Sequence, residues 1–232
     1  MAHAVIVAGG GGLRMGGTLS KQYLPLGGRP ILRRTVDAFA ACPDIAAIRL
    51  VIPESDADYC QAHILDALHA RKPIRIVSGG RRRQDSVRNG LMDLKGFIDD
   101  PETVVAIHDG VRPLVRPEDI RRCVAEARKT GACILGAPVV DTLKTVDGNG
   151  AVRGTLARDA IWSAQTPQAF RFGLIEAAHE AALSEGIEGT DDAALVERMG
   201  IEVRVIEGSR FNLKITTPED LKLAEAILSL SG

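Results

Sequence analysis

Short runs of β-branched and aliphatic residues alternate along the chain with longer segments whose apolar residues recur at helical spacing. The runs predict buried strands at residues 4–8, 48–52, 74–77, 104–108, 132–138 and 203–207. The periodic segments predict helices at residues 30–41, 55–70, 85–94, 117–130, 172–185, 191–199 and 218–230. Because strands that alternate with helices form βαβ units, we expect an α/β protein with a mostly parallel sheet covered by helices on both faces.

Residues 139–165 interrupt this alternation. They contain short polar and β-branched pieces on either side of DGNG at 147–150, a sequence that favours a tight hairpin turn. We therefore expect a β-arm that protrudes from the core and packs against a second copy of the chain, which covers the unpaired edges of its strands. No repeat or long linker divides the sequence, so residues 1–232 are predicted to form one domain that carries this arm.

The composition is that of a globular protein, with 45% hydrophobic and 25% charged residues. A net charge of −1 argues against broad attraction to nucleic acid or to a membrane surface. The start MAHAVIVAGG predicts a strand and a turn and not a signal peptide, and no apolar run has the length of a membrane span. The four cysteines show no CxxC spacing, so we expect ordinary thiols in a cytoplasmic protein.

The first predicted strand runs into the glycine-rich sequence AGGGGLRMGGTLSKQ. Glycines let the backbone approach a ligand and turn its N–H groups toward an anion, and ligands of open α/β sheets bind at the carboxyl ends of strands. The alternative is a solvated turn, since the GxGxxG-like spacing alone is weak and no Walker A motif is present. The charges of the segment favour a phosphate-binding loop. The residues predicted to take part are Ala8, Gly9, Gly10, Gly12, Arg14 and Lys21.

Two further polar segments follow predicted strands. SGGRRRQDSV at 78–87 opens a helix with Asp85 or Ser86 as the expected N-cap, a setting that suits a nucleotide. We assign one of its three arginines, Arg83, to the site. In HDGVRP at 108–113, Asp109 is suited to hold Mg²⁺ or a ribose hydroxyl and Arg112 to clamp a phosphate. The alternative is a buried Asp109–Arg112 pair that stabilises the turn, and His108 receives no role.

Three other segments are less telling alone. Arg158 and Thr166 flank the return of the arm in RDAIWSAQTPQAF. Lys214 lies in NLKITTPED, where Thr217 is expected to cap the final helix, and a lone lysine of this kind is usually solvated. The sequence TDD, which begins at Thr190, is typical of an ordinary helix cap.

Taken together and in order, eight segments resemble the 2-C-methyl-D-erythritol 4-phosphate cytidylyltransferases over nearly the whole chain. They are AGGGGLRMGG, SKQYLPLGGRPIL, GGRRRQDSVRNGL, HDGVRP, PVVDTLK, QTPQAF, TDDA and NLKITTPEDL. The resemblance implies a Rossmann-like nucleotidyltransferase fold and a homodimer joined through the β-arm. It also implies transfer of CMP from CTP to methylerythritol 4-phosphate, with Mg²⁺ and release of pyrophosphate, in non-mevalonate isoprenoid biosynthesis.

The resemblance also implies roles for individual residues. Arg14 and Lys21 would stabilise charge on the phosphates, while Arg158 and Lys214 would position the acceptor; Asp109 is the one candidate metal ligand. The implied CTP site comprises Ala8, Gly9, Gly10, Gly12, Arg14, Lys21, Gly80, Arg83, Ser86, Asp109 and Gly110. The implied acceptor site comprises Asp109, Arg112, Thr142, Arg158, Thr166, Thr190 and Lys214. The chain departs from the common family pattern with AGG for AAG, Ser20 for proline and HDGVRP for HDAARP.

Three alternatives differ in testable ways. A ribitol-5-phosphate cytidylyltransferase of the same fold shares the loop, the HDxxRP type of segment and QTPQ. A nicotinamide-dependent oxidoreductase needs an acidic residue after the second strand, where only Glu54 is available. A non-catalytic nucleotide-binding regulator would not need Arg158 and Lys214 so far from the loop. Since cations and threonines are abundant and no nucleophile stands beside a base, we expect direct in-line transfer without a covalent intermediate.

Overall fold

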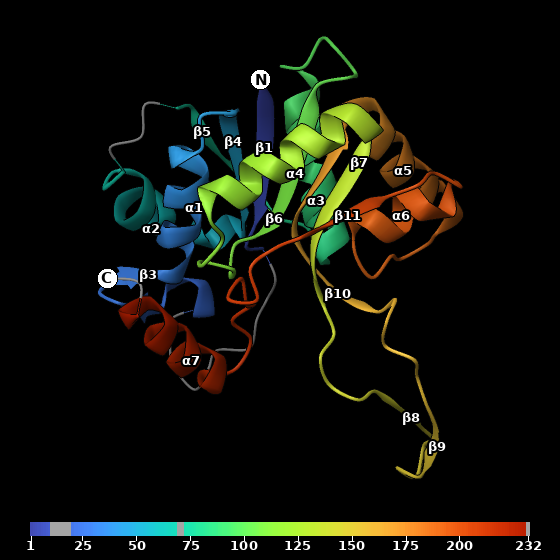
Figure 1. Cartoon of the computed structure of the whole chain (residues 1–232). Coiled ribbons are helices and arrows are strands. Elements are labelled where there is room, and N and C mark those ends of the chain that lie inside the picture. Colours follow the sequence, from blue (N-terminus) through green and yellow to red (C-terminus); the bar gives the residue numbers. More distant parts are fainter. Residues whose placement is uncertain (10–19, 69–71, 231–232) are drawn as a thin grey trace.

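A seven-stranded sheet forms the centre of the computed structural model, which describes residues 1–9, 20–68 and 72–230 (Figure 1). Its strand order is β11-β7-β10-β6-β1-β4-β5. The strands are β1 (Ala2–Val7), β4 (Ile45–Ile52), β5 (Ile74–Ser78), β6 (Val104–Asp109), β7 (Ala132–Pro138), β10 (Trp162–Arg171) and β11 (Arg204–Glu207). Only β10 runs antiparallel to its two neighbours, β6 and β7, among the described strands of this sheet. The predicted mostly parallel α/β architecture is therefore confirmed.

The central strands are mostly apolar because both faces of the sheet are covered. Successive side chains of a strand point to opposite faces. In β1, Ala4 and Ile6 accordingly join one hydrophobic cluster, while Val5 and Val7 join the other. All six residues of β6 are buried. This explains why continuous apolar runs, and not an alternation of apolar and polar residues, marked the strands in the sequence.

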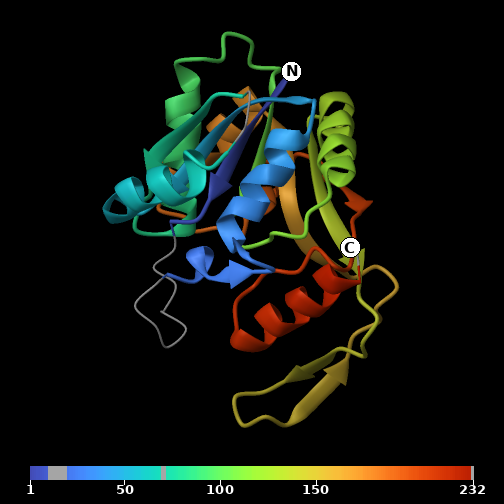
Figure 2. The ribbon, with the colours of Figure 1, turned by 90° about the vertical axis from the view of Figure 1, so that its left-hand side faces the viewer.

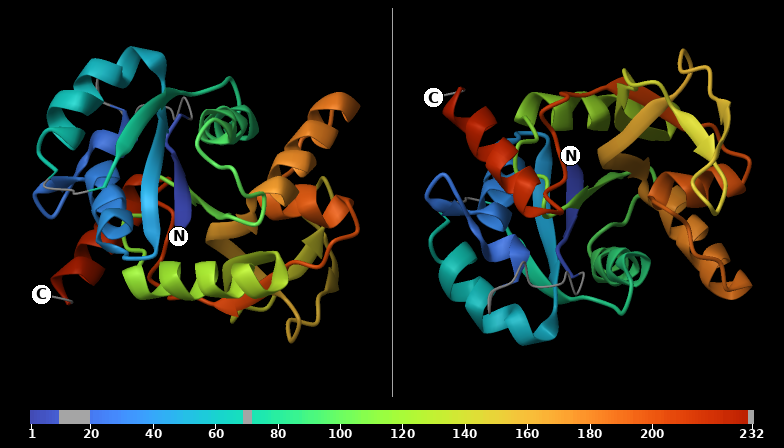
Figure 3. Two further views of the ribbon diagram at one scale, coloured as in Figure 1. Left: turned by 90° about the horizontal axis from the view of Figure 1, so that it is seen from above. Right: turned by 90° about the horizontal axis from the view of Figure 1, so that it is seen from below.

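Helices cover the two faces in separate groups, as the end-on views of the sheet show (Figure 3). One group is α1 (Ile31–Ala41), α2 (Ala57–Cys60) and α4 (Pro117–Thr130). The other is α3 (Arg83–Lys95), α5 (Phe172–Glu185) and α6 (Asp192–Arg198). A third, smaller cluster lies under α7 (Pro218–Ser229), where Ala224 packs with Leu26 and Ile31 beside the short pair β2 (Pro25–Leu26) and β3 (Arg29–Pro30).

Two helices differ from the sequence-based expectation. The helix expected at 55–70 consists of a 3₁₀ turn (Glu54–Asp56), α2 and a π-helical turn (Gln61–Leu65). The helix expected from residue 85 begins at Arg83, and Asp85 is its third residue and not its N-cap, because Asp85 accepts a hydrogen bond from the Arg82 backbone N–H at 3.1 Å. Ser86 lies one position further inside the helix.

Strand β10 was not predicted. Pro167 lies within it, and proline argues against a central strand because it has no N–H to donate to the ladder. The structure accommodates Pro167 where the pairing of β10 with β7 shifts register, between Ala164 and Gln168. Residues 162–165, expected in the arm, accordingly belong to the sheet.

The expected hairpin is present in the arm. Strands β8 (Lys144–Val146) and β9 (Val152–Thr155) pair antiparallel, and the Asp147 carboxylate accepts hydrogen bonds from the N–H groups of Asn149 and Ala151 at the turn. Figures 1 and 2 both show this hairpin projecting away from the sheet and its helices. Its edges therefore contact little of the rest of the chain.

The connections of the sheet reverse direction between β1 and β6. From β1 the chain passes through α1 to β4 and β5 on one side, whereas β6 leads through α4 to β7 on the other. Such a switch point opens a crevice at the carboxyl ends of the two strands, where open α/β sheets bind ligands.

The four cysteines are free and buried as expected. No helix in the described ranges is long and apolar enough to cross a membrane.

Gly90 in α3 provides a test of how closely this helix packs on the sheet. A Cβ atom at Gly90 would lie 2.5 Å from Val5 Cγ1 and 3.0 Å from Val51 Cγ2, both rigid core side chains. Overpacking typically costs about 1–3 kcal/mol, and a helical Gly→Ala change recovers at most about 1 kcal/mol through propensity. We expect Gly90→Ala to lower the free energy of unfolding in urea by about 1–2 kcal/mol.

Gly96→Ala is the matched control, since no atom lies within 4 Å of a Cβ atom there and its φ is −75°. It should be neutral or slightly stabilising. Equal stability of the two variants would contradict the close contact between α3 and β1.

Candidate active site

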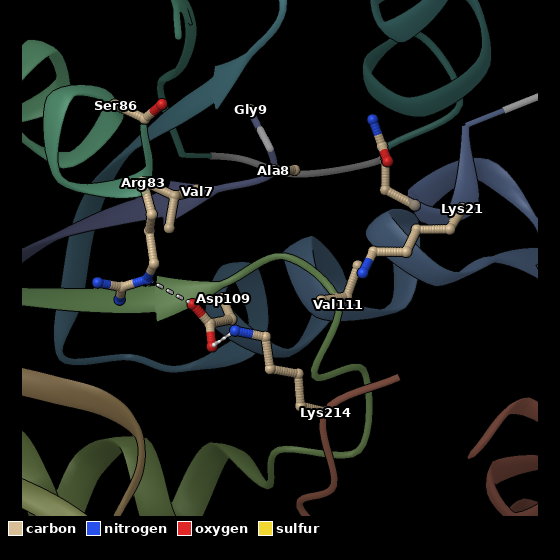
Figure 4. A pocket seen from close by; sticks show the side chains of 10 residues that line it. Val7, Ala8, Gly9, Lys21, Arg83, Ser86, Asp109, Val111 and Lys214 are labelled. Carbon is tan, nitrogen blue, oxygen red and sulfur yellow. Dashed lines mark hydrogen bonds and ion pairs between the residues drawn. The ribbon is translucent and has the colours of Figure 1, made fainter. Parts of the chain in front are cut away.

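Two adjoining pockets open at the carboxyl ends of β1 and β6. The first has a volume of about 150 Å³ and is lined by Val7, Ala8, Gly9, Lys21, Gln22, Arg83, Ser86, Asp109, Val111 and Lys214 (Figure 4). The second has a volume of about 300 Å³ and is lined by Arg83, Asp109, Arg112, Ala164, Gln165, Thr166, Gln168, Thr190, Asp191 and Lys214. The two pockets share one charged cluster, because both are lined by Arg83, Asp109 and Lys214.

Asp109, the last residue of β6, is the centre of this cluster. Its Oδ1 accepts a hydrogen bond from Arg83 Nε at 2.9 Å, and its Oδ2 lies 3.1 Å from Lys214 Nζ (Figure 4). Arg112 Nε lies 3.5 Å from the same Oδ2. Burial alone would raise the pKa of Asp109, but the charges of Arg83 and Lys214 outweigh it and hold the pKa well below its ordinary range. Asp109 is therefore an anion that gathers three cationic side chains at one point.

Positive charge exceeds negative charge around both pockets. The described lining residues include four cations, Lys21, Arg83, Arg112 and Lys214, but only two carboxylates, Asp109 and Asp191. Burial lowers the pKa of Lys21, and the nearby Lys214 lowers it further, while Asp109 and Asp220 act in the opposite direction. Such an excess of partly buried cations is unfavourable in the free protein and suits an anionic ligand such as a polyphosphate.

His108 and Thr166 support Asp109 from behind. The Thr166 hydroxyl donates to His108 Nδ1 at 2.9 Å and accepts a hydrogen bond from the Asp109 N–H at 3.1 Å, while His108 Nε2 lies 3.2 Å from the Arg112 carbonyl oxygen. Burial lowers the pKa of His108 to about 3, so the ring is neutral and donates through Nε2. Both ring nitrogens of His108 therefore take part in hydrogen bonds to neighbouring protein groups.

The glycines near the first pocket permit close approach of backbone segments. A Cβ atom at Gly9 would lie 2.9 Å from Ser86 Oγ, which itself accepts a hydrogen bond from the Gly80 N–H at 3.0 Å. A Cβ atom at Gly110 would lie 2.8 Å from the Cβ of Ala8. The end of β1, the start of α3 and the turn after β6 therefore meet at distances that only glycine allows.

The structure places most, but not all, of the expected site residues together. Gly80 and Gly110 line neither pocket. Thr142 and Arg158 are exposed in the arm and line neither pocket; the Arg158 guanidinium donates to the Val140 carbonyl. Gly10, Gly12 and Arg14 lie outside the described residues. The residues that line a pocket as expected are Ala8, Gly9, Lys21, Arg83, Ser86, Asp109, Arg112, Thr166, Thr190 and Lys214.

Sequence reasoning missed several polar residues of the site. Gln22 lines the first pocket, whereas Gln165, Gln168 and Asp191 line the second. Asp191 is the N-cap of α6, as expected, and accepts from the Ala194 N–H at 2.9 Å. For Asp191 the sequence offers no separate signal of a site, because a helix cap already accounts for its carboxylate.

The donor groups fit a Mg²⁺ ion that takes most of its ligands from a substrate. Among the described residues, no group of three or more His, Cys, Asp or Glu side chains could hold a metal. Asp109 is the one carboxylate in the described wall of the first pocket, and its low pKa keeps it ionised. Mg²⁺ is commonly held by one or two carboxylates together with substrate phosphates and water.

A glycine-bordered pocket at the switch point of a doubly wound sheet, joined to a second cationic pocket, defines an α/β enzyme that handles phosphorylated ligands. The family model described as 2-C-methyl-D-erythritol 4-phosphate cytidylyltransferase matches residues 2–230. The chain belongs to this family and is therefore a nucleotidyltransferase. The predicted resemblance and the predicted fold are confirmed, and the nicotinamide-dependent and non-catalytic alternatives are set aside.

Individual relatives agree along the whole chain. The 2-C-methyl-D-erythritol 4-phosphate cytidylyltransferase of Syntrophotalea carbinolica is 48% identical over 230 residues, which cover 99% of this chain and 97% of that protein. The Geotalea uraniireducens protein of the same name is 46% identical, with 97% and 95% covered. The crystal structure of 4-diphosphocytidyl-2C-methyl-D-erythritol synthase from Anaerococcus prevotii superposes with a TM-score of 0.85 at 36% identity, covering 98% of this chain and 96% of that one.

Asp109→Asn tests the charge balance of the cluster. Without the carboxylate, three cations face one another, and we expect the free energy of unfolding at pH 7 to fall by about 1–3 kcal/mol. This is less than the roughly 3–5 kcal/mol for fully buried pairs, because the half-exposed Lys214 is screened by solvent. Because the folded-state pKa of Asp109 is depressed, its contribution is present above the ordinary carboxyl pKa and disappears as the pH falls through the folded-state value.

The readout is urea denaturation of wild type and variant, each with and without tripolyphosphate. An added polyanion should stabilise the variant more than the wild type, since it replaces the missing negative charge. A variant that is as stable as the wild type in the absence of anion would contradict the proposed balance.

Proposed function

We propose that this chain transfers CMP from CTP to 2-C-methyl-D-erythritol 4-phosphate by direct in-line attack, in non-mevalonate isoprenoid biosynthesis. The membership in the cytidylyltransferase family supports the reaction and its two substrates. The observation that supports the mechanism is that two pockets share Arg83, Asp109 and Lys214. A nucleotide in one pocket and a phosphorylated acceptor in the other would bring their phosphates together at this cluster.

CTP is assigned to the first pocket, next to the backbone of Ala8 and Gly9 and the ammonium of Lys21. The acceptor is assigned to the second pocket, where Arg112 and Lys214 face its phosphate. A phosphate oxygen of the acceptor forms a bond to the α-phosphorus, the bond from that phosphorus to the bridging oxygen breaks, and pyrophosphate leaves. Two anions must approach for this step, so the excess of cations offsets their repulsion and holds them in line.

The same residues argue against a covalent enzyme intermediate. The Asp109 carboxylate is surrounded by cations that hold its pKa low, so it is a weak nucleophile and a weak base. Both nitrogens of His108 are engaged in hydrogen bonds. Lys21, together with Arg14 as the family resemblance implies, would stabilise the charge that develops on the leaving pyrophosphate. When bound with CTP, Mg²⁺ would be held by Asp109 and would neutralise phosphate charge.

The arm supports a homodimer. Val146, Val152 and Leu156 are exposed on it, and such apolar side chains on a projecting hairpin are typical of a surface that another chain covers. Thr142 and Arg158 lie on the arm outside the pockets of their own chain. We propose that each arm delivers these two residues to the acceptor pocket of the partner, in a cytoplasmic dimer.

An assay with purified protein tests the reaction and the acceptor. CTP and Mg²⁺ are supplied with either methylerythritol 4-phosphate or ribitol 5-phosphate, and pyrophosphate release is measured. Release with methylerythritol phosphate is expected; release with ribitol phosphate alone would select the related activity, and release with neither would refute both.

In the same assay, Lys21→Gln should lower kcat at least about 100-fold with a smaller change in KM, because Lys21 acts mainly on the charge of the transition state.

Mixing two inactive variants tests the shared site. Lys21→Gln removes a residue of the pocket, and Arg158→Ala removes a residue of the arm. If the arm completes the partner's site, each mixed dimer holds one intact site, so co-expression should restore roughly a quarter of the wild-type activity. Activity no higher than that of the single variants, in dimers shown to be mixed, would place Arg158 in the site of its own chain or outside the site.

A further inference from the structure

A continuous series of charged contacts runs from the shared cluster into the helical layer behind it. Arg83 Nε donates to Asp109 Oδ1 at 2.9 Å, and Arg83 Nη1 lies 2.9 Å from Asp192 Oδ2. The other oxygen of Asp192, Oδ1, lies 3.1 Å from His179 Nε2. The series thus joins the end of β6, the first residue of α3, the first residue of α6 and the middle of α5.

Asp192 and His179 are buried far more completely than their partner at the site. Asp192 is 1% exposed and His179 is 2% exposed, whereas the Arg83 side chain is 29% exposed. Burial alone would raise the pKa of Asp192, but Arg83 and His179 outweigh it, so the carboxyl has a pKa below its ordinary value. An isolated carboxylate at this depth would be very unfavourable, so Asp192 is present as an anion because of these two partners.

The position of Asp192 is fixed by β10. The side-chain oxygen of Gln168 accepts hydrogen bonds from the N–H groups of Asp192 and Ala193, both at 3.1 Å, and its amide nitrogen donates to Asp191 at 2.7 Å. Gln168 is itself buried. The start of α6 is therefore held against the sheet, and its first carboxylate is directed at Arg83.

The hydrogen bond to Asp192 also fixes the tautomer of His179. An ionised carboxylate can only accept, so His179 Nε2 carries the proton. Its Nδ1 is buried and has no hydrogen-bond partner among the described residues. Among the described residues, the hydrogen bond of the His179 ring is therefore the one to Asp192.

From these contacts we infer that His179 and Asp192 are positioning residues of the transfer reaction, which hold the Arg83 guanidinium between the two pockets. The inference rests on the proposed function and names residues that act on the reaction only through Arg83. Neither residue lines the first or the second pocket.

The need for such a support follows from how Asp109 is shared. Asp109 is also contacted by Lys214 and Arg112, so it cannot by itself fix the direction of the Arg83 fork. Arg83 Nε donates to Asp109 and Arg83 Nη1 forms an ion pair with Asp192, so two carboxylates attract the guanidinium at two of its nitrogens. Its remaining nitrogen, Nη2, is assigned to a phosphate of the substrate.

Asp192→Asn tests the proposal, because it keeps the shape of the side chain and removes its charge. With Arg83 free to turn, we expect kcat to fall on the order of 10- to 100-fold, while KM for CTP changes less than about threefold. The matched control is Asp119→Asn. Asp119 is likewise 1% exposed, lies in the first turn of a helix and is paired with arginines, but it lines neither pocket. Its kcat should stay within about twofold of the wild type.

A double-mutant cycle separates positioning from folding. Arg83→Lys keeps a positive charge beside Asp192 but loses the two-point contact. If Asp192 acts through Arg83, adding Asp192→Asn to Arg83→Lys should lower kcat by no more than about threefold further. Two results would overturn the proposal. The first is a double variant whose loss of kcat equals the product of the two single losses. The second is a kcat of Asp192→Asn equal to that of Asp119→Asn, after both are corrected for the folded fraction measured by circular dichroism.

Conservative replacement tests His179. Gln can present an N–H close to the position of His Nε2, so His179→Gln should retain most of kcat, whereas the apolar His179→Leu should resemble Asp192→Asn. Equal activity of the two His179 variants would overturn the role of the histidine.

An NMR measurement makes the proposal independent of turnover. The Nε–H signal of Arg83 should exchange slowly with solvent in the wild type and rapidly in Asp192→Asn, even if the wild type proves inactive with both acceptors. Slow exchange in both proteins would contradict the positioning role and leave the proposed reaction untouched.

Discussion

The attraction between the Asp109 carboxylate and the cations around it is the interaction on which the site depends. Asp109 ends a fully buried central strand at the point where the sheet changes direction, so its oxygens emerge where two pockets meet. This single anion gathers Arg83 and Lys214 from distant parts of the chain, together with Arg112 from the turn that follows β6. Without it, their mutual repulsion would separate them.

The cluster remains positively charged overall, and this imbalance links stability to function. Cations that are partly withdrawn from water and not fully neutralised make the free protein less stable than it could be. The cost is offset when phosphates enter, and the same excess of charge lowers the barrier for two anions to meet. The lowered pKa of Lys21 reflects this excess of partly buried positive charge, because it arises from burial and from repulsion by Lys214.

Rigidity behind the cluster comes from buried polar contacts and not from the apolar cores alone. Thr166 and His108 fix the backbone and the side of Asp109, and Gln168 fixes the start of α6. Each of these groups is buried and hydrogen-bonded, so any rearrangement would leave a polar atom unsatisfied. The arm carries Thr142 and Arg158, and neither of them lines a pocket of its own chain.

The sequence by itself determined the strands and helices whose pattern is local. Continuous apolar runs marked β1, β6 and β7, because strands covered on both faces have no polar side, and the N-cap of α7 followed from Thr217 and the residues after it. The ordered motifs determined the family. Tertiary structure alone decided what depends on contacts across the chain: that β10 accepts Pro167 at a register shift, that Asp192 faces Arg83 and not solvent, and that Arg158 lies outside its own chain's pockets. Local pattern cannot reveal these features, because each is set by the partner that a residue meets only after the sheet has formed.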